Sequence, residues 1–385
     1  MATINKRSWT TPNGTKGEAW QLSYVDGTGT PRRKNFKKKA DAEAYRIKVE
    51  GEVVAGVHTA DSVSVTIAQA ADLFLEGRKA RELERSSIDQ YNGHIENHLK
   101  PLIGATKLSR LTMPDVKAFA ETLIKTGRSR STAVKVLSTL RSIIKDAQGS
   151  GLVAQNVALG VTIPVRKRHK EAVVIPTNVQ LRAMVETAET AFPDFYPMLL
   201  TGIFAGLRSS ELRGLRLIDI DLKAATISVR QRADAWAVIG APKSAAGRRT
   251  IPIPPMLVSV LRAWILKAPK SDLGLAFPNS KGGAMLHSNL VNRAFWPLQI
   301  AAGVCEPSGK VDDEGAPIMR ALFGLHSLRH AAASSWINQR VDLKRLMVWL
   351  GHSTIQMTLD TYGHLIVDEA QDAAIAKASE AALFG

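Results

Sequence analysis

Four short segments in the second half of the chain collect arginine, lysine, histidine and tyrosine. Such side chains can bind a phosphate, stabilise developing charge, move protons and supply a nucleophile. In the first segment, 201–212, the sequence predicts an apolar helix ending at Gly206 and a second helix beginning at Ser209. Arg208 at the junction would lie beside helix N–H groups that favour an anion, and Glu211 could orient nearby groups. Alone, the pair could instead be an ordinary ion pair on a helix surface.

The second segment, 242–249, lies between two predicted strands and carries Lys243. A lysine on a mobile hairpin could reach into a neighbouring site and donate a proton. The segment taken alone favours a simpler interpretation, a solvated basic turn.

The third segment opens a predicted helix with His326, Arg329 and His330. His326 and Arg329 share a helix face, because they are three residues apart. The spacing of the two histidines also suits a metal, but zinc hydrolases with this spacing place glutamate where this chain has Ser327. We therefore expect no metal here; the segment alone would also fit a helix start with surface histidines.

The fourth segment runs from His352 to Tyr362. The interval allows one short helix, with Tyr362 just beyond its end. A tyrosine in this place could act as a nucleophile, or it could simply pack its ring and expose its hydroxyl.

These segments belong to a predicted C-terminal domain, 177–385, which opens with a capping box at Thr177–Gln180. Helices dominate it. Short strands are expected at 226–229, 236–239 and 249–253, and the stretch 303–321 is expected to be an exposed loop.

Two further domains are expected before it. Residues 64–165 should be all helical, with helices that start at Thr66 and Ser86, the latter stopping near Pro101. Residues 1–63 should form a small sheet backed by one helix, which is a known way to place strands in a DNA groove. A basic linker, 166–176, would join the helical and C-terminal domains; it could follow the DNA backbone or be a solvated tether.

The charge of the chain points to a polyanionic partner. The formal net charge is +16 and the isoelectric point is near 10.0. Nucleic acid is the favoured partner, although a generally basic surface would also aid solubility. The candidate DNA contacts are Arg32, Arg33, Lys34, Lys37, Lys38, Lys39, Arg128, Arg130, Lys135, Arg141, Arg166, Lys167 and Arg168.

Several classes of protein are not expected. No apolar run approaches the roughly 18 residues that a membrane helix needs, and the first residues show no secretion signal. The single cysteine, Cys305, cannot form an internal disulfide or a cysteine zinc cage. We expect a cytoplasmic, nucleoid-associated bacterial protein.

Together, the segments resemble the tyrosine recombinases, the phage integrase family, in the boxes Ala-Gly-Leu-Arg-Ser-Ser-Glu-Leu, His-Ser-Leu-Arg-His and Leu-Gly-His…Tyr-Gly-His. The resemblance is specific from about residue 177 onward; the basic N-terminal sheet looks like an arm-binding domain, less specifically. It implies a mostly α fold with small β-sheets (α+β) in several domains. It also implies a catalytic set in which Glu211 is a supporting residue: Arg208, Lys243, His326, Arg329, His352 and Tyr362.

The resemblance further implies a site-specific recombinase that cuts and rejoins double-stranded DNA through a 3′-phosphotyrosyl bond. Neither metal nor ATP is expected as a cofactor, because the tyrosyl ester conserves the energy of the broken bond. A homotetramer would act on paired sites, with accessory DNA-bending or directionality factors as possible partners. The alternatives are an Xer-like resolvase, a topoisomerase-like strand-relaxing enzyme and a non-catalytic DNA-binding protein on the same scaffold.

Overall fold

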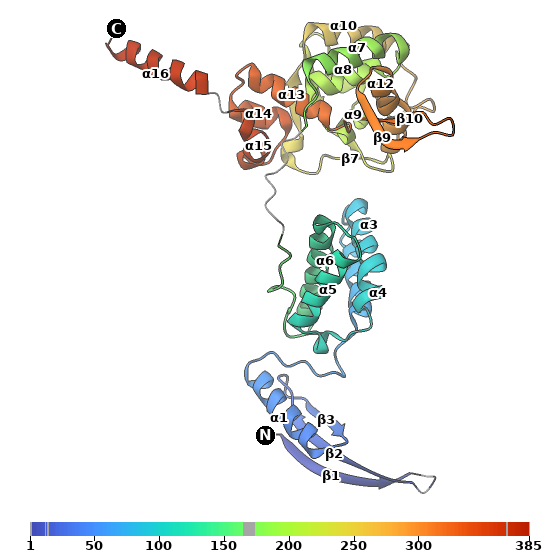
Figure 1. Cartoon of the computed structure of the whole chain (residues 1–385), viewed down its shortest axis with the longest axis vertical. Coiled ribbons are helices and arrows are strands. Elements are labelled where there is room, and N and C mark those ends of the chain that lie inside the picture. The colour runs from blue at the N-terminus through green and yellow to red at the C-terminus, as the bar shows by residue number, and fades with distance from the viewer. Residues whose placement is uncertain (1, 12, 14, 165–173, 367–368, 385) are drawn as a thin grey trace. The chain divides into compact units, whose positions relative to one another are not determined.

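A computed structural model describes residues 2–11, 13, 15–164, 174–366 and 369–384, with side chains in the last segment from residue 377. The chain divides into two compact units, Met1–Arg168 and His169–Gly385. Both are built mainly of helices with small antiparallel sheets, as the sequence predicts (Figure 1). None of the described helices is long and apolar enough to span a membrane.

The first unit begins with a sheet covered on one face by a helix (Figure 1). Its strands alternate, so that Leu22 and Tyr24 pack toward Val49 of the helix while the other face is open to solvent. Asp26 closes the turn before the third strand, accepting hydrogen bonds from the backbone N–H groups of Thr28 and Thr30. The elements are β1 (Thr3–Thr10), β2 (Lys16–Val25), β3 (Pro31–Phe36) and α1 (Lys39–Val54).

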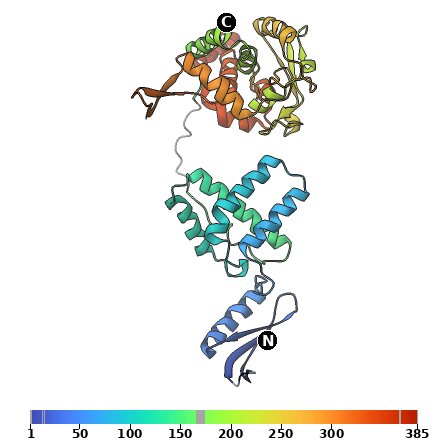
Figure 2. The same ribbon diagram turned by 90° about the vertical axis from the view of Figure 1, so that its right-hand side faces the viewer.

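The first unit continues as a helical bundle with its own apolar core (Figure 2). Thr66 caps its first helix through a capping box with Gln69, as predicted. The helix predicted to stop near Pro101 passes through a π-helical turn and ends after Ile103, close to the predicted position. Pro101 stands directly after the π-helical turn, where the helical hydrogen-bond pattern changes register. The elements are α2 (Ile67–Ala80), α3 (Arg85–His94), η1 (Ile95–Leu99), α4 (Lys100–Ile103), η2 (Leu108–Arg110), α5 (Met113–Lys125) and α6 (Arg130–Gly149).

The second unit surrounds one almost wholly buried apolar helix, α8. The predicted capping box at Thr177 starts the unit's first helix. The strands predicted at 226–229 and 249–253 form β5 and β8, which pair in one sheet. The unit consists of α7 (Asn178–Ala191), α8 (Tyr196–Ala205), α9 (Ser209–Gly214), η3 (Leu217–Asp219), β4 (Ile220–Asp221), β5 (Thr226–Val229), β6 (Arg232–Ala233), β7 (Ile239–Gly240), η4 (Ala245–Gly247), β8 (Arg249–Pro252), α10 (Pro255–Lys267), α11 (His287–Leu290), η5 (Val291–Phe295), α12 (Trp296–Ala301), β9 (Cys305–Val311), β10 (Pro317–Ala321), α13 (Ser327–Asn338), α14 (Leu343–Leu350), α15 (Ile355–Tyr362), η6 (Gly363–Leu365) and α16 (Glu369–Phe384).

Two expectations for this unit were wrong. The strand expected at 236–239 is mostly a turn, because the Asp234 carboxylate accepts from two backbone N–H groups and Ala237 adopts a φ of +65°. The exposed loop expected at 303–321 is instead an antiparallel hairpin, β9–β10, that projects from the unit in both views (Figures 1 and 2). A turn in which Gly315 has a φ of +82° closes it.

Candidate active site

Arg208 stands at the N-terminal end of α9, directly after α8. Gly206 ends α8 with a φ of +58°, a left-handed conformation that glycine adopts without strain. The chain therefore turns sharply, and the Arg208 guanidinium donates to Glu211 Oε1 at 2.8 Å. The backbone N–H of Arg208 donates to Glu211 Oε2 at 2.8 Å, so that one carboxylate fixes both ends of the arginine.

Glu211 is buried and holds a second arginine, Arg249 of β8. The guanidinium of Arg249 donates to the two carboxylate oxygens at 3.0 and 2.8 Å. Burial alone would raise the pKa of Glu211, but Arg249 and then Arg208 outweigh it and lower the pKa to about 2. Glu211 is therefore ionised at neutral pH and offsets part of the positive charge around it.

Three consecutive backbone carbonyls at the end of α14 each accept from a different arginine. Trp349 O accepts from Arg249 at 2.6 Å, Leu350 O accepts from Arg329, and Gly351 O accepts from Arg208 at 3.0 Å. The last carbonyls of a helix have no partner within the helix and carry its negative dipole end. The end of α14 thus gathers guanidinium groups from three separate parts of the unit.

Arg329 of α13 is almost fully buried, with 2% of its surface exposed. It also donates to Gly206 O at 2.9 Å, which joins it to the turn before Arg208. Burial lowers the pKa of Arg329 to about 9, with a further contribution from Arg208. Because this pKa still lies above 7, Arg329 is charged at neutral pH.

His352 follows directly after the three carbonyls. Its Nδ1 lies 2.9 Å from Thr358 Oγ1, which fixes the orientation of the ring. Burial lowers the pKa of His352 to about 4, and the charges of Arg329 and Arg208 act in the same direction. The pKa of His326 is also lowered to about 4, by desolvation first and then by His330 and the two arginines, Arg329 and Arg208. Both histidines are neutral at pH 7 and can donate one N–H each.

Tyr362 is the last residue of α15 and not just beyond it, and only 1% of its surface is exposed. Its hydroxyl lies 2.8 Å from Nδ1 of His330. Burial raises the pKa of Tyr362 to about 12, while the charges of Arg329 and Arg208 pull it downward. Because His330 directly follows Arg329 on α13, this contact holds the hydroxyl beside the helical turn that carries Arg329.

Lys243 lies exposed in the loop between β7 and η4. The short helix η4, which follows this loop, touches the site, since the carbonyl of Ala246 lies 3.0 Å from the place that a Cβ on Gly351 would occupy. The converging contacts described above do not include the Lys243 side chain, so its role stays a prediction.

The candidate DNA contacts of the N-terminal sheet fall into two groups. Arg32 and Lys34 face the helix side of the sheet and bind Asp26 and Asp61 at 2.7 and 3.1 Å. Lys34 also lies over the ring of Tyr45, 3.9 Å from its centroid. The others are exposed: Arg33, Lys37, Lys38 and Lys39.

In the helical bundle, two of the candidate arginines have backbone partners. Arg141 donates to the carbonyls of Ala158 and Val161, and Arg130 donates to Pro164 O. Arg128 and Lys135 are both exposed. The remaining candidates lie outside the described residues: Arg166, Lys167 and Arg168.

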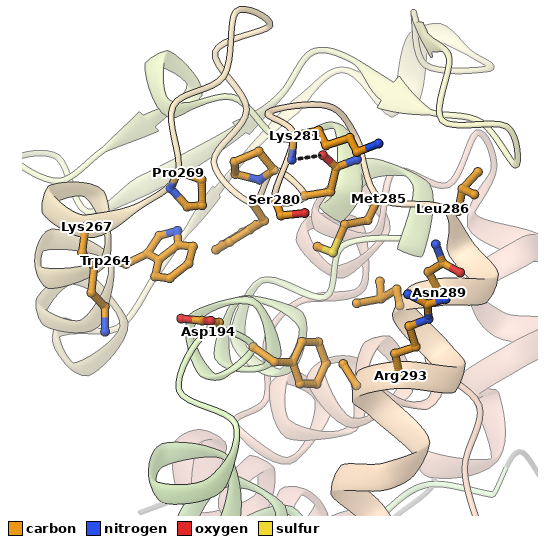
Figure 3. Close-up of a pocket in the computed structure, with 16 residues that line it drawn as sticks. Asp194, Trp264, Lys267, Pro269, Ser280, Lys281, Met285, Leu286, Asn289 and Arg293 are labelled. Carbon is orange, nitrogen blue, oxygen red and sulfur yellow. Dashed lines mark hydrogen bonds between the residues drawn. The ribbon is translucent and has the colours of Figure 1, made fainter.

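A separate hollow of about 710 Å³ lies between α10, the loop before α11, and η5 (Figure 3). Trp264 and Phe277 are among its apolar lining residues, and Lys267, Lys281 and Arg293 add positive charge. None of the predicted catalytic residues lines it, so it is distinct from the arginine cluster. Among the described residues, no group of three or more His, Cys, Asp or Glu side chains is arranged to hold a metal ion.

Three residues at the site were not predicted: Arg249, His330 and Thr358. Arg249 stands in a basic segment in which the sequence singled out only the lysine. For His330 the sequence suggested a metal ligand, which was not favoured, or a surface histidine. Arg249 begins β8, and His330 lies within α13. The local sequence does not reveal the roles of these two residues, because their partners come from other elements.

Known proteins resemble the chain along most of its length. A putative prophage phiRv2 integrase of Mycobacterium tuberculosis is 27% identical over 350 residues, which cover 87% of this chain and 86% of that protein. The integrase of Mycobacterium phage L5 is 24% identical over 387 residues, 97% of each chain.

Solved structures show a similar fold. The Tn1549 transposon integrase, in complex with a circular intermediate DNA, has a TM-score of 0.66 and 20% identity, covering 82% of this chain and 99% of that chain. A lambda integrase tetramer bound to a Holliday junction has a TM-score of 0.55 and 18% identity, covering 90% and 95%.

The match to a family is confined to the second unit. Residues 177–369, about half of the chain, match the Phage integrase family, and all the residues gathered at the end of α14 lie within that range. The chain therefore belongs to the phage integrase family of tyrosine recombinases, enzymes that cut and rejoin DNA through a tyrosine.

Proposed function

We propose that this chain recombines DNA at specific sites, through a 3′-phosphotyrosyl bond to Tyr362, and so integrates or excises a prophage or other mobile element. The observation that carries the proposal is the convergence of Arg208 and Arg329 at the end of α14, directly before His352. The hydroxyl of Tyr362 lies 2.8 Å from His330, the residue that follows Arg329. Fixed donors around one phosphate are what a transition state with extra negative charge requires.

Arg208 and Arg329 would hold the non-bridging oxygens of that phosphate. In each of these arginines, both terminal nitrogens donate one N–H to a protein acceptor. Each terminal nitrogen carries a second N–H, which can donate to a ligand. Arg249 differs, because Nε and both terminal nitrogens already donate to Glu211 and to backbone carbonyls. We therefore propose that Arg249 and Glu211 position the arginines that bind the phosphate. Loss of one of those phosphate donors, Arg208 or Arg329, should cost about a hundredfold in rate.

Cleavage would proceed by attack of the Tyr362 oxygen on phosphorus and departure of the 5′-oxygen. His352 would add a donor to the phosphate, His326 would assist proton transfer near it, and Lys243 would protonate the departing oxygen. Because only 1% of Tyr362 is exposed, DNA binding must uncover its hydroxyl. A second 5′-hydroxyl can attack the tyrosyl ester and reseal a strand without metal or ATP; cleavage should therefore persist in excess EDTA.

We propose the boundaries 1–63, 64–165 and 177–385 for an arm-binding, a core-binding and a catalytic domain. In the first, the outer face of the sheet is the better candidate for a DNA groove, because Arg33 and Asn35 of β3 share it with Asn5 of β1 and Gln21 of β2. Arginine and amide side chains can read base edges there. This favours Arg33 over Arg32 and Lys34, whose charges already have partners.

Exchange of two duplexes needs four active sites, so we propose a homotetramer on paired DNA sites. The solved lambda integrase tetramer on a Holliday junction supports this assembly through its similar fold. The helix α16 is the candidate for contact between neighbouring subunits.

An integrase is favoured over an Xer-type resolvase. The alignment with the phage L5 integrase spans 97% of both chains, whereas that with the tyrosine recombinase XerC of a Mycobacterium species covers 68% of this chain. A longer XerC-like recombinase of Caldanaerobacter subterraneus aligns over 90% of this chain, so the contrast holds for the shorter XerC proteins alone. The N-terminal sheet domain is consistent with the longer match.

Trapping the covalent intermediate tests the function. A pool of nicked duplexes cut from DNA flanking the gene would be incubated with wild-type protein and with Tyr362→Phe, and then resolved on a denaturing gel. We expect an adduct only with the wild type, while mobility shifts show equal specific binding by both. Sequencing the trapped DNA identifies the core site. An adduct that persists with Tyr362→Phe would refute the assignment of the nucleophile.

A further inference from the structure

His330 contacts the atom that would attack DNA. Its Nδ1 lies 2.8 Å from the Tyr362 hydroxyl, and the two rings meet edge to face with centroids 5.6 Å apart. His330 stands on α13 directly after Arg329, so one turn of helix presents both a phosphate donor and a partner for the nucleophile.

We propose that His330 is the general base that removes the phenolic proton of Tyr362 during strand cleavage and returns it during resealing. The inference rests on the proposed function, because it assigns one step of that reaction. A base must lie within hydrogen-bond reach of the proton that it removes, and His330 meets this condition in the structure without DNA.

The proton balance is complete with groups of this chain. Neutral His330, with its proton on Nε2, accepts the Tyr362 proton on Nδ1 and becomes imidazolium while the bond between Oη and phosphorus forms. The bond from phosphorus to the 5′-oxygen breaks, and Lys243 supplies the proton to that oxygen. In resealing, the 5′-hydroxyl returns its proton to Lys243, and the imidazolium protonates the departing tyrosyl oxygen.

The surroundings keep His330 in the form that a base needs. The ionisable groups that face it are His326 and Arg329 of its own helix and Tyr362 of α15. Burial lowers the pKa of His330 and Arg329 acts in the same direction, so that the ring is neutral at pH 7. Around Tyr362 the packing is otherwise apolar, with Leu346 and Leu350 of α14 close by. Water is therefore a poor competitor for the phenolic proton.

The test compares His330→Asn with the wild type in single-turnover cleavage of a nicked duplex that carries the trapped core site. Asparagine can place a hydrogen-bonding atom near Nδ1, but it cannot take up the proton. Asn338→Ala, an exposed change on the same helix, controls for damage to α13. At pH 7 we expect about a hundredfold slower adduct formation by His330→Asn, the usual contribution of a general base, with unchanged DNA affinity.

The pH dependence separates a base from a residue that only positions the ring. Without a base, Tyr362 must ionise by itself, and the ionised fraction of a phenol with a pKa of about 12 grows about tenfold with each pH unit. The rate ratio between wild type and His330→Asn should therefore shrink from pH 7 to pH 9 until the two are nearly equal. Lys243 is present in both proteins, so its titration cancels in the ratio.

A sulfur leaving group gives an independent readout. Replacing the bridging 5′-oxygen by sulfur removes the need for an acid, since a thiolate departs unprotonated. On that duplex Lys243→Ala should recover, whereas His330→Asn should stay slow.

A rate ratio that does not change with pH, recovery of His330→Asn with the sulfur duplex, or faster cleavage by His330→Asn would each overturn the proposal. The last result would mean that His330 holds Tyr362 in an idle position. If wild-type protein forms no adduct, the proposed function fails and the inference falls with it. If the wild type forms the adduct normally and His330→Asn forms it equally fast, the inference about His330 fails while the proposed function stands.

Discussion

Replacement of Glu211 by glutamine should destabilise the second unit strongly at neutral pH. The side chain is 3% exposed and binds Arg249 and Arg208. Glutamine has nearly the same shape but carries no charge, and its NH₂ group would face guanidinium donors. The change leaves the arginines around the end of α14 without their buried counter-charge.

The size of the effect follows from the pKa of Glu211. Folding lowers it from 4.5 to about 2, which corresponds to about 3 kcal/mol of unfolding free energy at neutral pH. Removing one partner of a buried ion pair typically costs about 3–5 kcal/mol. The two estimates agree, so we expect a loss of about 3–4 kcal/mol.

Urea unfolding followed by tryptophan fluorescence measures this, because Trp336 and Trp349 lie in contact beside the site. The folded pKa lies below the unfolded one, so the stabilisation is complete above about pH 4.5 and is lost as the pH falls toward about 2. The difference between wild type and Glu211→Gln should therefore be constant from pH 7 to pH 5 and shrink below that.

Glu306→Gln is a matched control, because Glu306 pairs with Arg320 on the exposed hairpin β9–β10 and both side chains are largely open to solvent. An exposed pair of this kind contributes about 0–1 kcal/mol. A loss below about 1 kcal/mol for Glu211→Gln, or a difference that stays constant down to pH 3, would contradict the buried-pair reasoning.

Three further results are expected. Gly351→Ala should cost about 1–3 kcal/mol in urea unfolding and slow cleavage, because its φ is +61° and the new Cβ would lie 2.9 Å from the Arg249 guanidinium; wild-type stability would contradict this. Thr358→Val should slow adduct formation about tenfold by freeing the His352 ring, with equal DNA binding in mobility shifts; an unchanged rate would argue against that positioning. DNA affinity should fall steeply with salt, with a logarithmic slope of about 0.9 per phosphate contacted; a flat response in a titration would contradict a basic DNA-binding surface.

Local chemistry made much of the fold predictable from the sequence. Capping boxes at Thr66 and Thr177 were found because a cap depends on residues three apart in the chain. The hairpin at 305–321 was missed because Pro307 and Gly309 interrupt its strand pattern, and the pairing with β10 decides its structure. The π-helical turn before Pro101 likewise leaves no mark in the hydrophobic pattern.

The catalytic candidates were found through short motifs, but their supports were not. Arg249 binds Glu211 from 38 residues away and Trp349 from 100 residues away. His330 meets Tyr362 from 32 residues away. Such partnerships arise only once the elements pack, so residue type and spacing do not reveal them.

The three carbonyls at the end of α14 also bear on synthesis of the protein. Arg208 can bind Gly351 only after another 143 residues have been synthesised, and at about 5–20 residues per second this interval lasts roughly 7–30 seconds on the ribosome. During that time the cationic side chains already synthesised have only part of their final partners, because α13 and α14 are completed only at the end of the interval. The arginine cluster therefore assembles only after the end of α14 has been synthesised.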